Sequence, residues 1–241
     1  MHKNISPNIN YSNIPIFNGI SSDAANKLLK NAKTTKYKKG QLICSYGEPS
    51  QYFLIVVAGL VKLFKSNENG DEIVFKVARE SEALLEISFS PVYMGNAQAV
   101  NNAEILAIPT ADFQATLQDD KTFAINMFTQ MGNCTQNLVA HIEQLTLKTA
   151  TQRIGWFLLK LLIEKSGADK KNIKLPYDKL LISEYLGMRP ETFSRTIQQM
   201  NEYGINIDSK NVTLTDTKAL CNFCTAETAV KCTDFDKQNC M

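Results

Sequence analysis

Hydrophobic and polar residues change their spacing several times along the chain. Between residues 22 and 33, a Ser/Asp start followed by spaced apolar residues predicts a short helix. From about residue 36 to 110, short segments rich in β-branched and aromatic residues alternate with glycine-containing turns. The pair Asn69-Gly70 is a strong hairpin signal. Many short strands with regular turns predict a β-roll or barrel rather than a parallel sheet.

A heptad pattern marks the next segment, about residues 120–147. Its apolar residues recur at alternating steps of four and three, which is the spacing of a coiled-coil seam. A helix of this length exceeds the usual ~10–14 residues, so we expect it to form a parallel dimer, with packing against its own domain as the alternative. Cys134 is then a small hydrophobe, and His141 an interface residue rather than a ligand. The expected dimer interface consists of Met127, Met131, Cys134, Leu138, His141 and Leu145.

After an amphipathic helix over residues 150–165, two short helices are predicted between residues 178 and 200. Gly187 supplies a tight turn between them, and Pro190 stands in the first turn of the second helix, where its missing N–H costs nothing. This pattern predicts a helix-turn-helix, whose second helix enters a DNA major groove. A two-stranded wing is expected over residues 204–216. The expected DNA-binding residues are Arg189, Glu191, Thr192, Ser194 and Arg195.

The polar residues of the second helix suit base recognition. Glu191, Ser194 and Arg195 are spaced i, i+3 and i+4, so they share one helix face. Arginine can bind guanine through two hydrogen bonds, and glutamate can accept one from cytosine N4. A Glu–Arg surface pair without function is the alternative, and the neighbouring turn favours DNA recognition.

Composition and charge support a globular DNA-binding protein. The chain has 241 residues, of which 44% are hydrophobic, enough to build a core. We expect no membrane span and no secretory signal, and therefore a cytoplasmic protein with reduced thiols. Residues 146–220 contain twelve Lys and Arg against eight Asp and Glu. This modest excess suits a nucleic-acid partner but also an ordinary surface.

Four of the six cysteines lie in the last 21 residues, with the spacing C-x2-C-x7-C-x7-C: Cys221, Cys224, Cys232 and Cys240. In a reducing compartment such a group favours metal or redox chemistry over disulfides. A C-x-x-C pair occurs in both zinc and iron–sulfur sites. It can also be the dithiol of a reductase, but that motif usually opens a helix of a βαβ unit, which is not predicted here. We expect no enzyme.

Three segments resemble the CRP/FNR family of transcription regulators: KKGQLICSYGEPSQYFLIVVAGLVKLF, EQLTLKTATQRIGWFLLKL and RPETFSR. The resemblance covers roughly residues 15–220. It implies an α+β chain with a β-roll over residues 1–118, a dimerisation helix over 119–147, a winged helix-turn-helix over 148–220 and a cysteine-rich tail over 221–241. The resemblance further implies a homodimer that binds double-stranded DNA at a TTGAT-type palindrome, with RNA polymerase as a further expected partner.

The resemblance also bears on the effector. Cyclic-nucleotide binders of the family use a Gly-Glu pair and an Arg-Ser pair. Here Glu86 can align with the glutamate, but Leu85 replaces the glycine, and Asn96 and Ala97 stand in place of Arg-Ser. A phosphate needs a cation or a cluster of donors, so we expect no cyclic AMP.

The FNR branch of the family holds an oxygen-labile [4Fe-4S] cluster. Some members carry its cysteines after the helix-turn-helix, with a tighter spacing than here and a non-cysteine fourth ligand. We therefore expect a [4Fe-4S] cluster on the four tail cysteines, with a structural zinc as the alternative. Haem in the β-roll is a weaker alternative because His2 and His141 are the only histidines.

Overall fold

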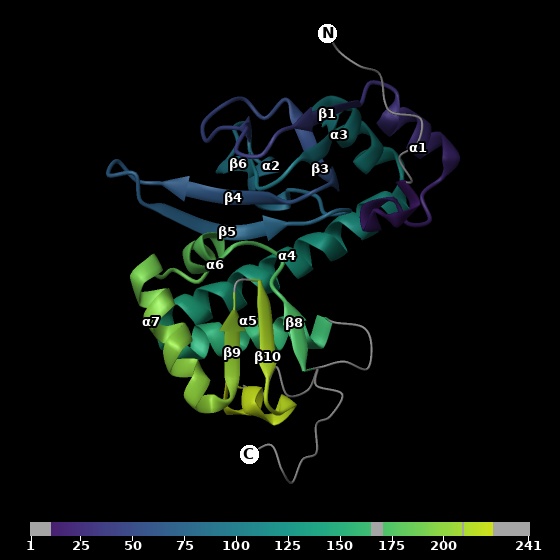
Figure 1. The fold of residues 1–241 in the computed structure, drawn as a ribbon. Coiled ribbons are helices and arrows are strands. Elements are labelled where there is room, and N and C mark those ends of the chain that lie inside the picture. Colours follow the sequence, from purple (N-terminus) through teal and green to yellow (C-terminus); the bar gives the residue numbers. More distant parts are fainter. Residues whose placement is uncertain (1–10, 165–170, 209, 224–241) are drawn as a thin grey trace. The chain divides into compact units, whose positions relative to one another are not determined.

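The computed structural model describes residues 11–164, 171–208 and 210–223, in two compact units, Met1–Ala140 and His141–Met241 (Figure 1). The α-helices are α1 (Ser22–Leu29), α2 (Leu85–Ser88), α3 (Thr110–Asp119), α4 (Lys121–Leu147), α5 (Ala150–Glu164), α6 (Lys179–Tyr185) and α7 (Pro190–Met200). The 3-10 helices are η1 (Tyr11–Asn13), η2 (Pro15–Phe17), η3 (Asn201–Tyr203) and η4 (Thr217–Phe223). No helix in these described ranges is long and apolar enough to cross a membrane.

The first unit contains two antiparallel sheets, with strand orders β1-β7-β3 and β2-β6-β4-β5. The strands are β1 (Lys33–Tyr37), β2 (Leu42–Cys44), β3 (Tyr52–Ala58), β4 (Val61–Ser66), β5 (Glu72–Ala78), β6 (Asn96–Ala99) and β7 (Ala103–Pro109). The Asn69-Gly70 turn joins β4 to β5 as expected, and the Asn67 side chain accepts hydrogen bonds from the N–H groups of Asn69 and Asp71.

Both faces of β3 and of its neighbour β7 are buried, which explains the continuous apolar run in β3. Leu54 and Val56 belong to a core shared with residues of β4 and β6. Phe53 and Ile55, on the opposite face, belong to a second core that includes Phe123 at the start of α4. Because successive side chains of a strand point to opposite faces, a half-polar pattern would leave one of these cores unfilled.

Two strands of this unit were not predicted, and one helix is shorter than expected. The strand β1 has the sequence KTTKY, which is mostly polar, and it lies at the edge of its sheet beside β7. The strand β6 has only four residues. The helix α1 ends at Leu29 instead of residue 33, because β1 begins there and pairs Lys33 with Ala107. Pairing across the sheet therefore decides these elements, and local composition does not.

The heptad stripe predicted as the dimer seam packs instead against its own chain. Met127 is 2% exposed within the second core, and Cys134 is half-buried against the same core. His141 is 4% exposed and stacks on the Tyr185 ring at 4.5 Å. Leu138 and Leu145 are half-buried, and only Met131 of this stripe is exposed. Of the expected interface residues, Met127 and His141 are therefore buried within their own chain, while Met131, Leu138 and Leu145 keep part of their surface exposed.

The second unit closes around a small sheet of order β8-β10-β9, made of β8 (Asn172–Lys174), β9 (Ile205–Asp208) and β10 (Asn211–Leu214). The strands β9 and β10 form the expected wing. The strand β8 precedes the two short helices in sequence and pairs with β10 from the other side. The sheet therefore joins the chain before the helix-turn-helix to the chain after it (Figure 1).

Candidate DNA-binding site

The two short helices form a helix-turn-helix with well-defined ends. The Asp178 side chain accepts a hydrogen bond from the N–H of Leu181 and caps α6. The turn passes through Gly187 in the left-handed region at φ +61°, a conformation that favours glycine. A Cβ at this position would also lie 2.7 Å from the Leu145 side chain. Pro190 then opens α7, as the sequence predicts.

Arg153 of α5 holds the turn against the end of α4. Its Nη1 atom donates to the carbonyl oxygens of Leu186 at 3.1 Å and Gly187 at 3.4 Å. Its Nη2 and Nε atoms donate to the carbonyl oxygens of Leu145 at 2.7 Å and Lys148 at 3.0 Å. One guanidinium thus satisfies carbonyls from both segments and fixes the turn from which α7 begins.

The helix α7 has a buried face and an exposed polar face. Its buried side chains are Phe193, Thr196, Ile197 and Met200. Thr196 donates its hydroxyl proton to the Thr192 carbonyl oxygen at 2.8 Å, so its polar group is satisfied inside the unit. Among the expected DNA-binding residues, Arg189, Glu191, Ser194 and Arg195 are exposed, whereas Thr192 is half-buried. The exposed residues provide the donors and acceptors that base edges require.

Two further exposed residues continue this polar face and were not predicted. Gln198 lies three residues after Arg195, and Gln199 lies four residues after it. Glutamine can bind adenine through two hydrogen bonds. The same i+3 and i+4 spacing that selected Ser194 and Arg195 would have identified both glutamines, had the pattern been followed to the end of the helix.

The last described element, η4, packs against α5. Leu220 is fully buried and Phe223 is 8% exposed. Cys221 is the only tail cysteine within the described residues, and it is exposed. Cys224, Cys232 and Cys240 lie outside those residues. No group of three potential metal ligands occurs in the described part of the chain, which holds one of the four tail cysteines.

In the β-roll, Glu86, which can align with the glutamate of the Gly-Glu pair, is part of an ion pair. Glu86 is almost buried, and its Oε1 atom lies 2.9 Å from Lys76 Nζ, which is also 3.1 Å from Glu82. Burial alone would lower the pKa of Lys76, but the charges of Glu86 and Glu82 outweigh it, so the pKa is raised. Lys76 therefore stays charged and neutralises the Glu86 carboxylate.

The remaining positions of this region carry no phosphate-binding pair. Asn96 uses its side-chain oxygen to accept a hydrogen bond from the N–H of Tyr46 at 2.9 Å, and Ala97 is fully buried. Leu85 is also buried and starts α2. Burial and the nearby Glu86 raise the pKa of the Cys134 thiol to about 12, so this thiol is protonated near neutral pH.

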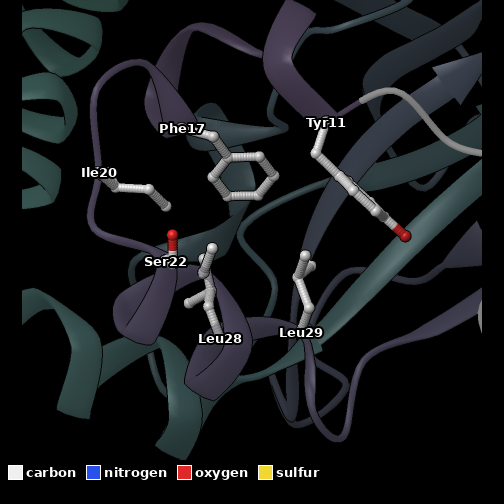
Figure 2. Close-up of a pocket in the computed structure, with 7 residues that line it drawn as sticks. Tyr11, Phe17, Ile20, Ser22, Leu28 and Leu29 are labelled. Carbon is white, nitrogen blue, oxygen red and sulfur yellow. The ribbon is translucent and has the colours of Figure 1, made fainter.

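A separate cavity of about 210 Å³ lies among the N-terminal helices (Figure 2). Its lining is mostly apolar and includes Phe17, Ile20, Leu28 and Leu29. Ser22 contributes a hydroxyl group. No charged side chain is among the described residues that line it. The cavity therefore does not supply the cation that a cyclic phosphate would require.

Comparison with known proteins agrees with both units. Residues 34–120 match the cyclic nucleotide-binding domain, and residues 152–223 match the Crp-like helix-turn-helix domain. Lacticaseibacillus casei has a probable transcriptional regulator, flp, that is 25% identical over 78% of this chain and 85% of its own length. The transcriptional activator protein anr of Pseudomonas aeruginosa is 24% identical over 83% of this chain and 82% of its own length.

The fold agrees with a solved structure as well. FixK2 from Bradyrhizobium japonicum superposes with a TM-score of 0.71 over 81% of this chain and 98% of that one, at 22% identity. This likeness concerns the fold, in which a β-roll, a long helix and a helix-turn-helix follow one another. The chain is a transcription regulator and not an enzyme, and it belongs to the CRP/FNR family.

Proposed function

We propose that the protein binds a TTGAT-like palindrome as a homodimer, and that an iron–sulfur cluster on its tail cysteines controls this binding. The single observation that carries the DNA-binding part is the exposed face of α7. Glu191, Ser194 and Arg195 lie together on the surface of this helix, opposite its buried apolar face. Their polar groups can therefore reach base edges while the apolar face keeps the helix packed on its own unit.

A palindromic site requires two recognition helices related by two-fold symmetry, and α4 offers a surface that would bring two chains together. Four of the large apolar side chains of this helix that are more than half exposed follow a heptad spacing: Ile125, Phe128, Val139 and Ile142. Between and after them, Thr135 and Thr146 donate their hydroxyl protons to the carbonyl oxygens of Met131 and Ile142. Their methyl groups are then left for a partner helix.

This exposed seam is displaced by one residue from the stripe that the sequence suggested. One residue corresponds to about 100° around a helix of 3.6 residues per turn. Met127 and His141 of the first stripe pack within the units to which they belong. The neighbouring exposed stripe is the one we propose as the dimer interface. RNA polymerase is a further proposed partner of the DNA-bound dimer.

We further propose that the β-roll does not respond to cyclic AMP. The Oε1 atom of Glu86 is paired with Lys76, and Asn96 and Ala97 supply no cation. We therefore propose that the cysteine-rich tail, residues 221–241, controls DNA binding. Four thiolates repel one another unless a metal holds them, and the four tail cysteines match the donor number of a [4Fe-4S] cluster or a zinc ion. A cluster would supply sensitivity to oxygen or nitric oxide.

Anaerobic purification tests this proposal. The protein should be brown, absorb near ~400 nm and contain about four iron and four sulfide per chain. Cys224→Ser should abolish the colour and weaken binding to a TTGAT palindrome in a mobility shift, whereas Cys44→Ser and Cys134→Ser should preserve both. If the protein contains one zinc per chain and no iron, the proposed iron–sulfur sensor is wrong and the tail holds a structural zinc.

A further inference from the structure

The exposed polar face of α7 extends one turn beyond Arg195. Four exposed polar residues of this helix follow the spacing i, i+3, i+4 and i+7: Glu191, Ser194, Arg195 and Gln198. In homeodomains, the recognition helix reads the major groove from four positions with this same spacing. Because α7 continues to Met200, Gln198 belongs to the helix itself and occupies the last of these four positions.

Gln198 and its neighbour Gln199 differ in direction. With about 100° per residue around the helix axis, Gln198 lies only about 20° from Glu191 and about 150° from the middle of the buried face of α7. Gln199 lies about 110° from the middle of that face and about 20° from Thr192, which is half-buried. Gln198 is therefore at the centre of the polar face, and Gln199 is on its flank.

The side chain of Gln198 has the chemistry of a base contact. It carries no charge, but its amide offers donors and an acceptor together, so it can bind N6 and N7 of adenine through two hydrogen bonds. Its backbone carbonyl oxygen accepts a hydrogen bond from the N–H of Asn201. No described residue forms a hydrogen bond with its side-chain amide. The amide is therefore available to DNA.

The position of Gln198 along the helix suits the base pair next to the one that Arg195 contacts. Three residues of helix rise correspond to about 4.5 Å, and successive base pairs are about 3.4 Å apart. In a TTGAT half-site the single guanine has an A·T pair on each side. An adenine is therefore present in the neighbouring base pair in either direction along the DNA.

We propose that Gln198 is a specificity-determining residue, which binds the adenine of the base pair next to the guanine that Arg195 binds. This inference rests on the proposed DNA-reading face of α7 and is independent of the iron–sulfur cluster.

The test removes one acceptor from the DNA and the amide from the protein. In 7-deazaadenine, N7 is absent but pairing with thymine is retained, and the substitution is made in both half-sites on one side of the guanine or on the other. We expect the unchanged chain to lose about fivefold or more in affinity at one of these two positions. Gln198→Ala should lose at least as much on the unmodified palindrome and nothing further with that 7-deazaadenine, because both changes remove the same contact. Additive losses at both positions would overturn the proposal.

Gln199→Ala is the matched control, because it removes the same amide from the adjacent exposed position. Alanine is the best helix former, so both variants should keep the helix content of the unchanged chain in circular dichroism. Gln199→Ala should retain the full affinity and the full effect of 7-deazaadenine. If Gln199→Ala loses this effect and Gln198→Ala retains it, the adenine contact belongs to the flank and the proposal is wrong.

Selection from a pool of random duplexes separates this inference from the proposed half-site. If the unchanged chain selects another palindrome, TTGAT is wrong, but Gln198→Ala should still relax the preference at one A·T pair next to a selected guanine and at no other pair. An unchanged preference at every base pair in this variant would overturn the role of Gln198 alone. If the unchanged chain selects no sequence, the proposed reading of DNA by α7 and the role of Gln198 are both wrong.

Discussion

The guanidinium of Arg153 donates a 2.7 Å hydrogen bond to the carbonyl oxygen of Leu145, in the last turn of α4. The same side chain also binds the carbonyl oxygens of Leu186 and Gly187 in the turn of the helix-turn-helix. A charged donor therefore connects the long helix to the turn that sets the direction of α7. Hydrogen bonds that involve a charged group are stronger than neutral ones.

Arg153→Met should destabilise the second unit, because it leaves these carbonyl oxygens without their donor. We expect a loss of about 1.5–3 kcal/mol in the free energy of unfolding, measured by urea denaturation. Arg153→Lys should recover only part of it, since an ammonium group cannot reach all the carbonyls from one position. An unchanged midpoint for Arg153→Met would show that water replaces the guanidinium at little cost.

Phe128→Glu should convert the dimer to a monomer. The side chain is 81% exposed in the single chain, so the substitution spares the core, but in the proposed dimer it would bury a charge near its symmetry mate. Sedimentation should show the monomer, with loss of binding to the palindrome. Asn137→Glu places the same charge on an exposed position of α4 away from the seam and should remain dimeric. A dimeric Phe128→Glu variant would contradict the exposed seam.

Arg195→Ala should weaken binding to the cognate half-site by about 1–3 kcal/mol through its guanine contact. Glu191→Ala should relax the preference at one base pair and change non-specific affinity little. Lys210→Ala, an exposed charge in the wing turn, controls for the loss of positive charge and should weaken all sequences alike. Titrations with cognate and scrambled duplexes measure the affinity of each variant. An equal loss of affinity for both duplexes in Arg195→Ala would indicate that Arg195 contacts only phosphate.

The stability of the first unit should fall as the pH rises above 9. Burial, the largest effect, and the charge of Glu48 raise the pKa of the Cys44 thiol to about 12, although a backbone hydrogen bond with Ala97 opposes them. An unfolded thiol loses its proton near the ordinary value of 9.0, so the folded state holds more protons between these values. Stability then decreases by up to about 1.4 kcal/mol per pH unit from this group.

Urea denaturation at several pH values on both sides of this threshold measures the slope. Cys44→Ala lowers stability at every pH through lost packing, but its stability should depend less on pH under alkaline conditions. Parallel curves for the two proteins would assign the alkaline loss to other groups, such as the Lys76 ion pair.

The sequence predicts the elements that bury one continuous apolar stripe and misses those defined by a partner strand. The strands β3, β4, β5 and β7 follow from their β-branched and aromatic residues. The strand β1 does not, because its five residues are mostly polar and only the pairing with β7 makes it a strand. Composition cannot indicate a pairing between residues so far apart in the chain.

The recognition helix could be predicted well because its constraints are local. Gly187, Pro190 and the apolar face of α7 lie close together in the sequence, and the exposed residues follow from their spacing. The heptad stripe of α4 was more difficult, because two apolar stripes run side by side along one helix. Periodicity gives the spacing of an apolar stripe but does not show which part of the protein the stripe packs against. Only the exposed fractions in the structure place Met127 in the core and Phe128 on the surface.

The strand β8 pairs with β10 across the whole helix-turn-helix, from Asn172 to Thr213. The helix-turn-helix segment therefore begins and ends in strands that are paired with each other in one small sheet. A fragment that contains only α6 and α7 would lack this strand pairing and the buried support of α5, so it should not fold alone. The smallest part of this chain that could read DNA on its own has to include α5 and both paired strands, which means residues 150–214, or 65 residues.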